Sequence, residues 1–155
     1  MKDLFIDNSC VVKNFANPAD EDYKTLIKWL LDYEEDSLNN AHLVVSNKLL
    51  NEYNRSSGGG SSMQNITTIV AILQRQGRLN KIENKDIKAF IKKHFTNKIK
   101  KKLQSNAADH PHIAIILLSE RKMALTEDIG LWNDLLNFPG YEIEVHNRPE
   151  ELPYR

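Results

Sequence analysis

The chain has 155 residues, of which 41% are hydrophobic, a size and composition that suit one domain with a single hydrophobic core. Its longest apolar run, Ile113 to Leu118, is much shorter than the roughly 20 residues that cross a bilayer, and the first residues lack the apolar segment of a secretory signal. We therefore expect a soluble, cytoplasmic protein without a membrane partner. Cys10 is the only cysteine, which excludes an internal disulfide and a Cys-type zinc site, and we interpret it as a buried core thiol.

The charges are unevenly distributed along the chain, although its formal net charge is zero. Residues Arg75 to Lys102 include eleven basic and two acidic residues, a net charge of +9, which leaves −9 on the remainder. A chain divided in this way can present a basic surface beside an acidic one, an arrangement suited to holding a polyanion next to a metal site. The alternative is a solvated, lysine-rich helical face, which is common in proteins.

Apolar patterns in the first third of the chain predict alternating strands and helices. In chain order these are a strand from Asp3 to Ile6 that ends at Asp7, a turn at Asn8 and Ser9, a helix from Asp20 to Tyr33 capped by Asp20, a strand from His42 to Val45, and a helix that Ser46 caps and that carries Leu49, Leu50 and Tyr53.

The middle of the chain predicts a flexible loop followed by helices. The glycine- and serine-rich segment 56–62 is the loop, and it is not a domain boundary because too few residues precede it to form a core. The predicted helices start at Ser62, with Ile66, Ile69, Val70 and Leu73 on one face, and at a cap at Asn84, and a shorter basic helix carries Ile99 and Leu103.

The apolar run Ile113 to Leu118 fits a buried strand or a buried helix by its pattern alone. We predict a helix because Asp109 can cap it, Pro111 is tolerated in a first turn, and an extension to Glu120 gives a helical length. Two strands are predicted after it, Lys122 to Thr126 and Tyr141 to Val145. This alternation predicts an α/β fold with a mainly parallel central sheet and helices on both faces.

Acidic residues stand where such a sheet gathers its ligands, beyond the carboxyl ends of the strands. Asp7 and Asp128 each follow a strand, and Glu52 and Asp109, on or before helices, are able to reach the same place. Four converging carboxylates repel one another unless a hard cation neutralises them, and oxygen ligands favour Mg²⁺ or Mn²⁺. Such an ion polarises a phosphodiester and delivers a water nucleophile.

Three of these acids also have a purely structural interpretation. Asp7 is able to cap a turn, Asp109 to cap a helix, and Asp128 to begin a loop. The five histidines show no pair at i,i+4 that indicates a metal site, and we interpret them as ordinary residues.

Four segments of the chain resemble, in the same order, the four sequence motifs of the PIN-domain nucleases. Leu4 to Val12 is similar to the first, an apolar strand followed by an aspartate, and Ser46 to Tyr53 to the second, a helix that carries a glutamate. Asp109 to Ser119 is similar to the third, an aspartate that opens an apolar helix, and Met123 to Asp128 to the fourth, a strand that ends in Thr-x-Asp. The resemblance implies a three-layer sandwich and covers nearly the whole chain.

The resemblance also implies a site and an activity. The metal-site carboxylates would be Asp7, Glu52, Asp109 and Asp128, with Ser9 and Thr126 as supporting hydroxyls; Glu127 is an alternative to Asp128, and Asp134 would lie at the rim. The implied activity is that of an endoribonuclease dependent on Mg²⁺ or Mn²⁺, commonly the toxin of a toxin-antitoxin pair. The alternative is a non-catalytic module that keeps the fold and binds nucleic acid or protein.

Two further expectations concern binding partners. We expect Lys98, Lys100, Lys101 and Lys102 to bind the RNA backbone because they are the densest part of the basic segment. We also expect a homodimer, because PIN-like nucleases often pair and because Trp29, Tyr33 and Met63 lie off the main apolar stripes and could form an exposed patch.

Overall fold

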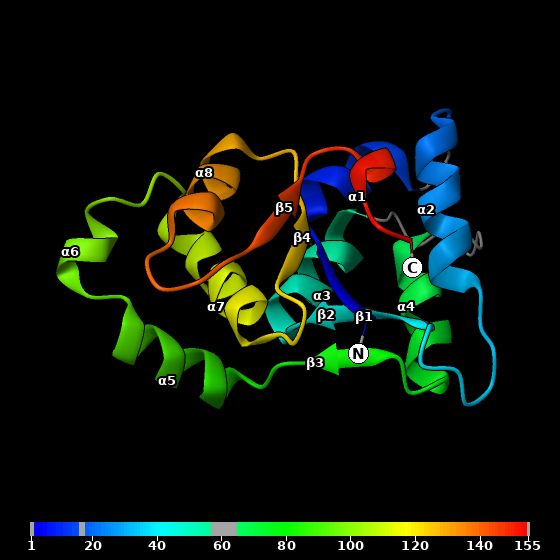
Figure 1. Ribbon diagram of the computed structural model, residues 1–155, viewed down its shortest axis with the longest axis horizontal. Coiled ribbons are helices and arrows are strands. Elements are labelled where there is room, and N and C mark those ends of the chain that lie inside the picture. Colours follow the sequence, from blue (N-terminus) through cyan, green and yellow to red (C-terminus); the bar gives the residue numbers. More distant parts are fainter. Residues whose placement is uncertain (1, 16–17, 57–64, 155) are drawn as a thin grey trace.

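The computed structural model describes residues 2–15, 18–56 and 65–154 (Figure 1). At its centre is a parallel sheet of five strands in the order β3-β2-β1-β4-β5. The strands are β1 (Lys2–Ile6), β2 (Ala41–Val45), β3 (Leu79–Lys81), β4 (Met123–Leu125) and β5 (Glu144–His146). The three inner strands, β1, β2 and β4, are short apolar runs because both faces of a parallel sheet are covered.

Eight α-helices connect and cover the strands in the described part of the chain. They are α1 (Asn8–Asn14), α2 (Glu21–Leu31), α3 (Asn47–Ser56), α4 (Ile66–Arg75), α5 (Asn84–His94), α6 (Asn97–Lys100), α7 (His110–Leu118) and α8 (Ile129–Asn137). The strand order reverses its direction at β1, so right-handed crossovers place the first four helices on one face and the later ones on the other. Accordingly α1 packs against α3 and α2 against α4, whereas α7 packs against α5 and α8. The expected α/β three-layer architecture is confirmed.

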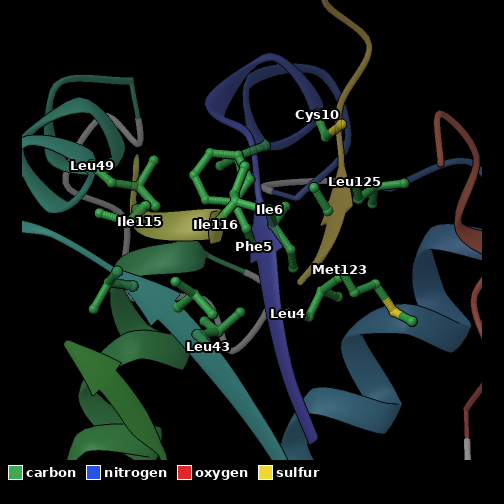
Figure 2. Packing of buried hydrophobic residues seen from close by; sticks show 14 of the residues in the cluster. Leu4, Phe5, Ile6, Cys10, Leu43, Leu49, Ile115, Ile116, Met123 and Leu125 are labelled. Carbon is green, nitrogen blue, oxygen red and sulfur yellow. The ribbon is translucent and has the colours of Figure 1, made fainter. Parts of the chain in front are cut away.

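The core lies where β1 meets the helices (Figure 2). Leu4, Phe5 and Ile6 of β1 are fully buried. Every residue of α7 from His112 to Leu117 is also buried, and this helix is apolar on nearly all sides because protein surrounds it. The predicted helix over this ambiguous run is confirmed. Cys10 is a buried free thiol, as expected, and burial raises its pKa to about 12.

Two α-helices and one strand were not predicted from the sequence. The Asn8-Ser9 pair begins α1 rather than a turn, and Cys10 N donates to Asp7 O at 3.0 Å as this helix starts. The edge strand β3 has only three residues, too few for an alternating pattern. Helix α8 follows Asp128 directly, where a loop was one interpretation.

One predicted helix cap was wrong by one residue, and two other predicted boundaries fall wholly or partly outside the described residues. Helix α4 is capped by Asn65, whose side chain accepts a hydrogen bond from Thr67 N at 2.9 Å, and the proposed start at Ser62 lies outside the described residues. Helix α5 begins at Asn84, so Glu83 rather than Asn84 is at the N-cap position. The predicted glycine-serine loop 56–62 lies outside the description except for Ser56, which ends α3.

Candidate active site

Asp7 and Asp128 come from neighbouring strands of the sheet. Asp7 follows β1 directly, Asp128 follows β4 after two residues, and β1 and β4 pair with Ile6 opposite Leu125. The backbone N–H of Asp7 donates to Leu125 O at 2.9 Å, so the ladder continues to the point where both strands end. Parallel strands end on one edge, and the two aspartates therefore lie on the carboxyl edge of the sheet.

The other two predicted acids approach from helices on either side. Glu52 is in the middle of α3, and Asp109 is the last residue of the 3₁₀ turn η1 (Ala107–Asp109) before α7. Asp109 is at the N-cap position of α7 but makes no capping hydrogen bond, so the structural interpretation of this residue is wrong. Its carboxylate is not engaged by the helix that it precedes.

The four acids act on one another electrostatically. Burial raises the pKa of Asp109; His112 opposes this, and repulsion from Asp128, Asp7 and Glu52 raises the pKa further. Asp109 therefore lies within electrostatic range of the other three acids.

Two hydroxyl groups hold the carboxylate of Asp7. Ser9 Oγ donates to Asp7 Oδ2 at 2.6 Å, and Thr126 Oγ1 donates to the same oxygen at 2.8 Å. The backbone of residues 126–128, which we call the β4 extension, joins this network. Asp128 N donates to Thr126 Oγ1 at 3.0 Å, and Glu127 N donates to Ser9 Oγ at 3.2 Å. The network fixes one oxygen of Asp7, and no described residue donates to the other.

Asp128 serves as a helix cap as well as standing beside the other acids. Its Oδ1 accepts a hydrogen bond from Leu131 N at 3.0 Å and so caps α8, while no described residue donates to its Oδ2. Glu127, the alternative to Asp128, instead faces Lys13, with Nζ and Oε2 at 3.8 Å.

Asp134, expected at the rim, is buried and structural. It accepts hydrogen bonds from Gln104 N at 2.7 Å and from Ser105 N at 2.8 Å, and the hydroxyl of Ser105 also donates to it. It ties the segment before α7 to helix α8.

Sequence reasoning missed His112, which we had interpreted as ordinary. Its Nε2 lies 2.7 Å from Glu52 Oε2, and the imidazole is only 1% exposed. Burial alone would raise the pKa of Glu52, but the hydrogen bond and charge of His112, together with Lys48 and Arg55, lower it below its usual value. One signal was available, because a histidine three residues after Asp109 in an otherwise apolar helix lies on the same face as that aspartate.

The donor chemistry of the four acids suits a hard divalent cation. All are oxygen ligands, and their mutual repulsion is the kind that such a cation relieves. As the side chains stand, however, no three His, Cys, Asp or Glu residues within 2–15, 18–56 and 65–154 are arranged to hold one ion. One oxygen of Glu52 is paired with His112, and one oxygen of Asp128 accepts a hydrogen bond from α8, so each of these two acids already has a partner of its own.

Comparison with solved structures assigns the fold. No family model matches the sequence, and no curated protein matches it. A chain of the VapBC2 complex of Rickettsia felis, solved bound to a DNA fragment from their promoter, matches with a TM-score of 0.57 and 14% identity over 94% of this chain and 98% of that one. VapBC-1 of nontypeable Haemophilus influenzae matches with a TM-score of 0.54 and 16% identity, over 93% and 96%. This protein has the PIN-domain fold. Likeness at such identities concerns the fold alone.

The basic segment of this PIN fold divides into a buried and an exposed part. Arg78 was counted with the exposed basic residues, but it is 1% exposed and its guanidinium donates to Leu30 O at 2.7 Å, to Ala41 O at 3.1 Å and to Gln76. It is a structural residue and contributes no binding surface. Lys98, Lys100, Lys101 and Lys102 are exposed, on α6 and directly after it, in the part of the chain that lies farthest from α2 (Figure 1).

Two of the three residues of the expected apolar patch, Trp29 and Tyr33, line one cavity together with polar residues. Trp29 is half-buried against Tyr154, with ring centroids 5.3 Å apart, and Tyr33 lies beneath Arg78 at 5.3 Å. Met63 lies outside the described residues, and the homodimer remains a prediction. No described helix has the length and apolar character needed to cross a membrane.

Proposed function

We propose that this protein is a metal-dependent endoribonuclease that hydrolyses phosphodiester bonds of RNA. The observation that carries the proposal is the position of Asp7 and Asp128 at the carboxyl ends of two paired strands of a PIN fold, within electrostatic range of Asp109. Clustered acids that repel one another are unfavourable for folding, and a site with a function explains why they are kept together.

In this proposal the four carboxylates would hold Mg²⁺ or Mn²⁺ after their side chains shift closer together than in the structure, Glu52 and Asp128 using the oxygens that their present partners leave free. The ion would supply Lewis-acid activation of the phosphodiester and of the attacking water. The residues of the chain position the donors. Ser9 and Thr126 fix one oxygen of Asp7 and leave the other available, and His112 orients the carboxylate of Glu52.

The exposed lysines supply the attraction for the substrate. Lys98, Lys100, Lys101 and Lys102 carry no ion pair to any acid among the described residues, so their charge is available to phosphates. The loop that follows them is tied by Asp134 to α8, the helix that Asp128 caps. These hydrogen bonds connect the proposed RNA-binding lysines to the helix that follows Asp128.

We further propose that the protein is the toxin of a toxin-antitoxin pair, with a small antitoxin protein as its partner. The support is its likeness to chains of two VapBC assemblies over more than nine tenths of its length. Expression of the intact chain alone should then arrest cell growth, and expression of the Asp7→Asn variant should not. Growth arrest by both variants would mean that toxicity is independent of the acids.

A single assay tests the chemistry. Pure protein is incubated with labelled single-stranded RNA or DNA, in Mg²⁺, in Mn²⁺ or in excess EDTA. Cleavage of RNA that needs the divalent ion and stops in EDTA is the expected result. The rival function, a non-catalytic nucleic-acid-binding module with this fold, predicts that RNA is bound in all three buffers and cut in none.

A further inference from the structure

A cavity lies directly beside the proposed catalytic acids. It has a volume of about 340 Å³, and its lining comprises Thr126, Glu127, Asp128, Ile129, Trp132, Asn133 and Asn147. The cavity is therefore bounded by the β4 extension, by the first turns of α8 and by the residue after β5, which lies next to β4 in Figure 1. Thr126, which forms part of its wall, is one of the two residues whose hydroxyl groups donate to Asp7.

We propose that this cavity binds one unpaired nucleobase of the RNA, next to the phosphate that is cut. The inference rests on the proposed nuclease function and adds to it a substrate class, single-stranded RNA with a base turned out of its stack. Proteins recognise single-stranded RNA chiefly in this way, by stacking splayed bases on aromatic rings and by bonding their edges.

The lining of the cavity suits both the flat face and the polar edge of a base. Trp132 offers a half-buried indole, and Ile129, with 76% of its side chain exposed, lies one helical turn before it on α8. An indole is a stacking platform that every base can use. Asn133 and Asn147 supply amides, each both a donor and an acceptor, which is the polar chemistry of a base edge. Asn133 Nδ2 already donates to Gln104 Oε1 at 3.1 Å, which holds that side chain in place.

Other occupants fit the cavity less well. A phosphate would meet the carboxylates of Glu127 and Asp128, which also line the cavity, and like charges at that distance repel. An apolar side chain from a partner protein would cover the indole but leave the two amides and Asp128 without hydrogen-bonding partners in the contact. A flat, neutral ring with polar edges avoids both penalties.

The direct test uses the fluorescence of Trp132. The sequence has two tryptophans, and Trp29 of α2, which lies well away from α8 in Figure 1, packs against Tyr154, so Trp29→Phe leaves Trp132 as the single reporter. Adding Asp7→Asn, a residue that does not line the cavity, prevents cleavage during the titration. The ligands are single-stranded RNA hexamers of A, C, G or U and an abasic hexamer with the same backbone.

We expect at least one base-containing hexamer to quench the fluorescence of Trp132. The abasic hexamer should quench it at least tenfold less. Equal quenching by the abasic hexamer would overturn the proposal, because the cavity would then respond to the backbone. Absence of quenching while the double variant still binds the hexamers would overturn it as well, since the base would lie elsewhere.

Cleavage kinetics separate the failure of this inference from the failure of the nuclease function. In the otherwise intact protein, Trp132→Ala should raise KM for single-stranded RNA roughly tenfold, the loss of one stacked base, whereas Trp132→Phe should restore most of it. Leu136→Ala is the matched control, because this residue is also exposed on α8 but does not line the cavity. Metal-dependent cleavage with an unchanged KM in Trp132→Ala would sink the base site and leave the nuclease standing, and no cleavage by the intact protein would sink the nuclease.

Discussion

Two buried aspartates, at the two ends of strand β1, show how differently one residue type is used in this fold. Asp3 is completely buried and accepts three hydrogen bonds, from Asn80 Nδ2 at 2.7 Å, Glu120 N at 3.1 Å and Arg121 N at 2.8 Å. These bonds occupy both of its oxygens and join β1 to β3 and to the turn before β4. Asp3 is a satisfied structural carboxylate.

Asp7 is almost as deeply buried, at 8% exposed, but its hydrogen bonds are arranged on one side only. Both hydroxyl donors go to Oδ2, and no described residue donates to Oδ1. Oδ1 is not one of the buried unpaired polar atoms of the described residues, so it reaches solvent and is accessible to a ligand. Burial alone therefore does not separate a structural from a functional acid, and the distribution of donors over the two oxygens does.

The strongest test of this contrast is the loss of cleavage when one oxygen of Asp7 is replaced. Asp7→Asn should lower the rate of RNA cleavage about 10³-fold or more, equivalent to about 4 kcal/mol in the barrier, because it removes a ligand charge. Its midpoint of thermal unfolding should stay level or rise, since repulsion within the acid cluster falls. Asp3→Asn is the control, with cleavage per folded molecule unchanged. Full metal-dependent activity in Asp7→Asn would remove Asp7 from the site.

Substitution of Asp3, at the start of β1, should lower stability rather than cleavage. Asp3→Ala leaves two backbone N–H groups and the amide of Asn80 without an acceptor in a buried place, which should cost about 3 kcal/mol of unfolding free energy. Urea denaturation measures this loss. Asn80→Ala removes one of the three donors and should cost about 1 kcal/mol. A loss in Asp3→Ala no greater than that in Asn80→Ala would contradict the assignment of Asp3 as a fold anchor.

The basic segment offers a third test, because it also combines structural and exposed charges. Replacing Lys98, Lys100, Lys101 and Lys102 with Gln should weaken RNA binding and reduce the slope of log K against log salt by up to about 3, at roughly 0.7 for each phosphate that is no longer neutralised. Turnover at saturating RNA should change little. Lys24→Gln with Lys28→Gln, on α2, is the control and should leave the slope unchanged. The same slope in the quadruple variant would mean that these lysines form only a solvated face.

The contrast between Asp3 and Asp7 also marks what the sequence could predict. The inner strands follow from local apolar runs, and the acids that come after them could be placed on the carboxyl edge from strand order alone. The partners could not, because Asp3 meets Arg121 across 118 positions and Asp7 meets Thr126 across 119. Whether a carboxylate is satisfied depends on such distant contacts. The motif order supplied by the resemblance was therefore needed to select Asp7 and to pass over Asp3.

The missed features have similar physical causes. Helix α8 buries Leu131 and Leu135 but exposes Ile129 and Leu136, so its apolar pattern does not form one clean stripe. Arg78 was grouped with the surface charges because its sequence neighbours are basic, whereas its guanidinium satisfies carbonyl groups of α2 and β2. His112 was overlooked because its partner, Glu52, is 60 positions away. In each case tertiary contacts, rather than local composition, decide the role of the residue.

The smallest expected effect concerns stability and pH, and it separates Asp109 from the satisfied acids. The pKa of Asp109 is raised in the fold, by burial and by its acidic neighbours, so the folded state holds the proton more tightly than the unfolded chain. Ionised Asp109 therefore costs folding free energy at neutral pH, and this cost disappears as pH falls below the ordinary value of 3.8, where both states are protonated.

In EDTA, Asp109→Asn should slightly raise the thermal midpoint at pH 7 and leave it unchanged near pH 3. The matched variant Asp134→Asn should lower the midpoint at pH 7, because the carboxylate that it replaces is fully bonded. A lower midpoint in both variants at pH 7 would show that Asp109 is as well satisfied as Asp134 and that the four acids do not repel one another.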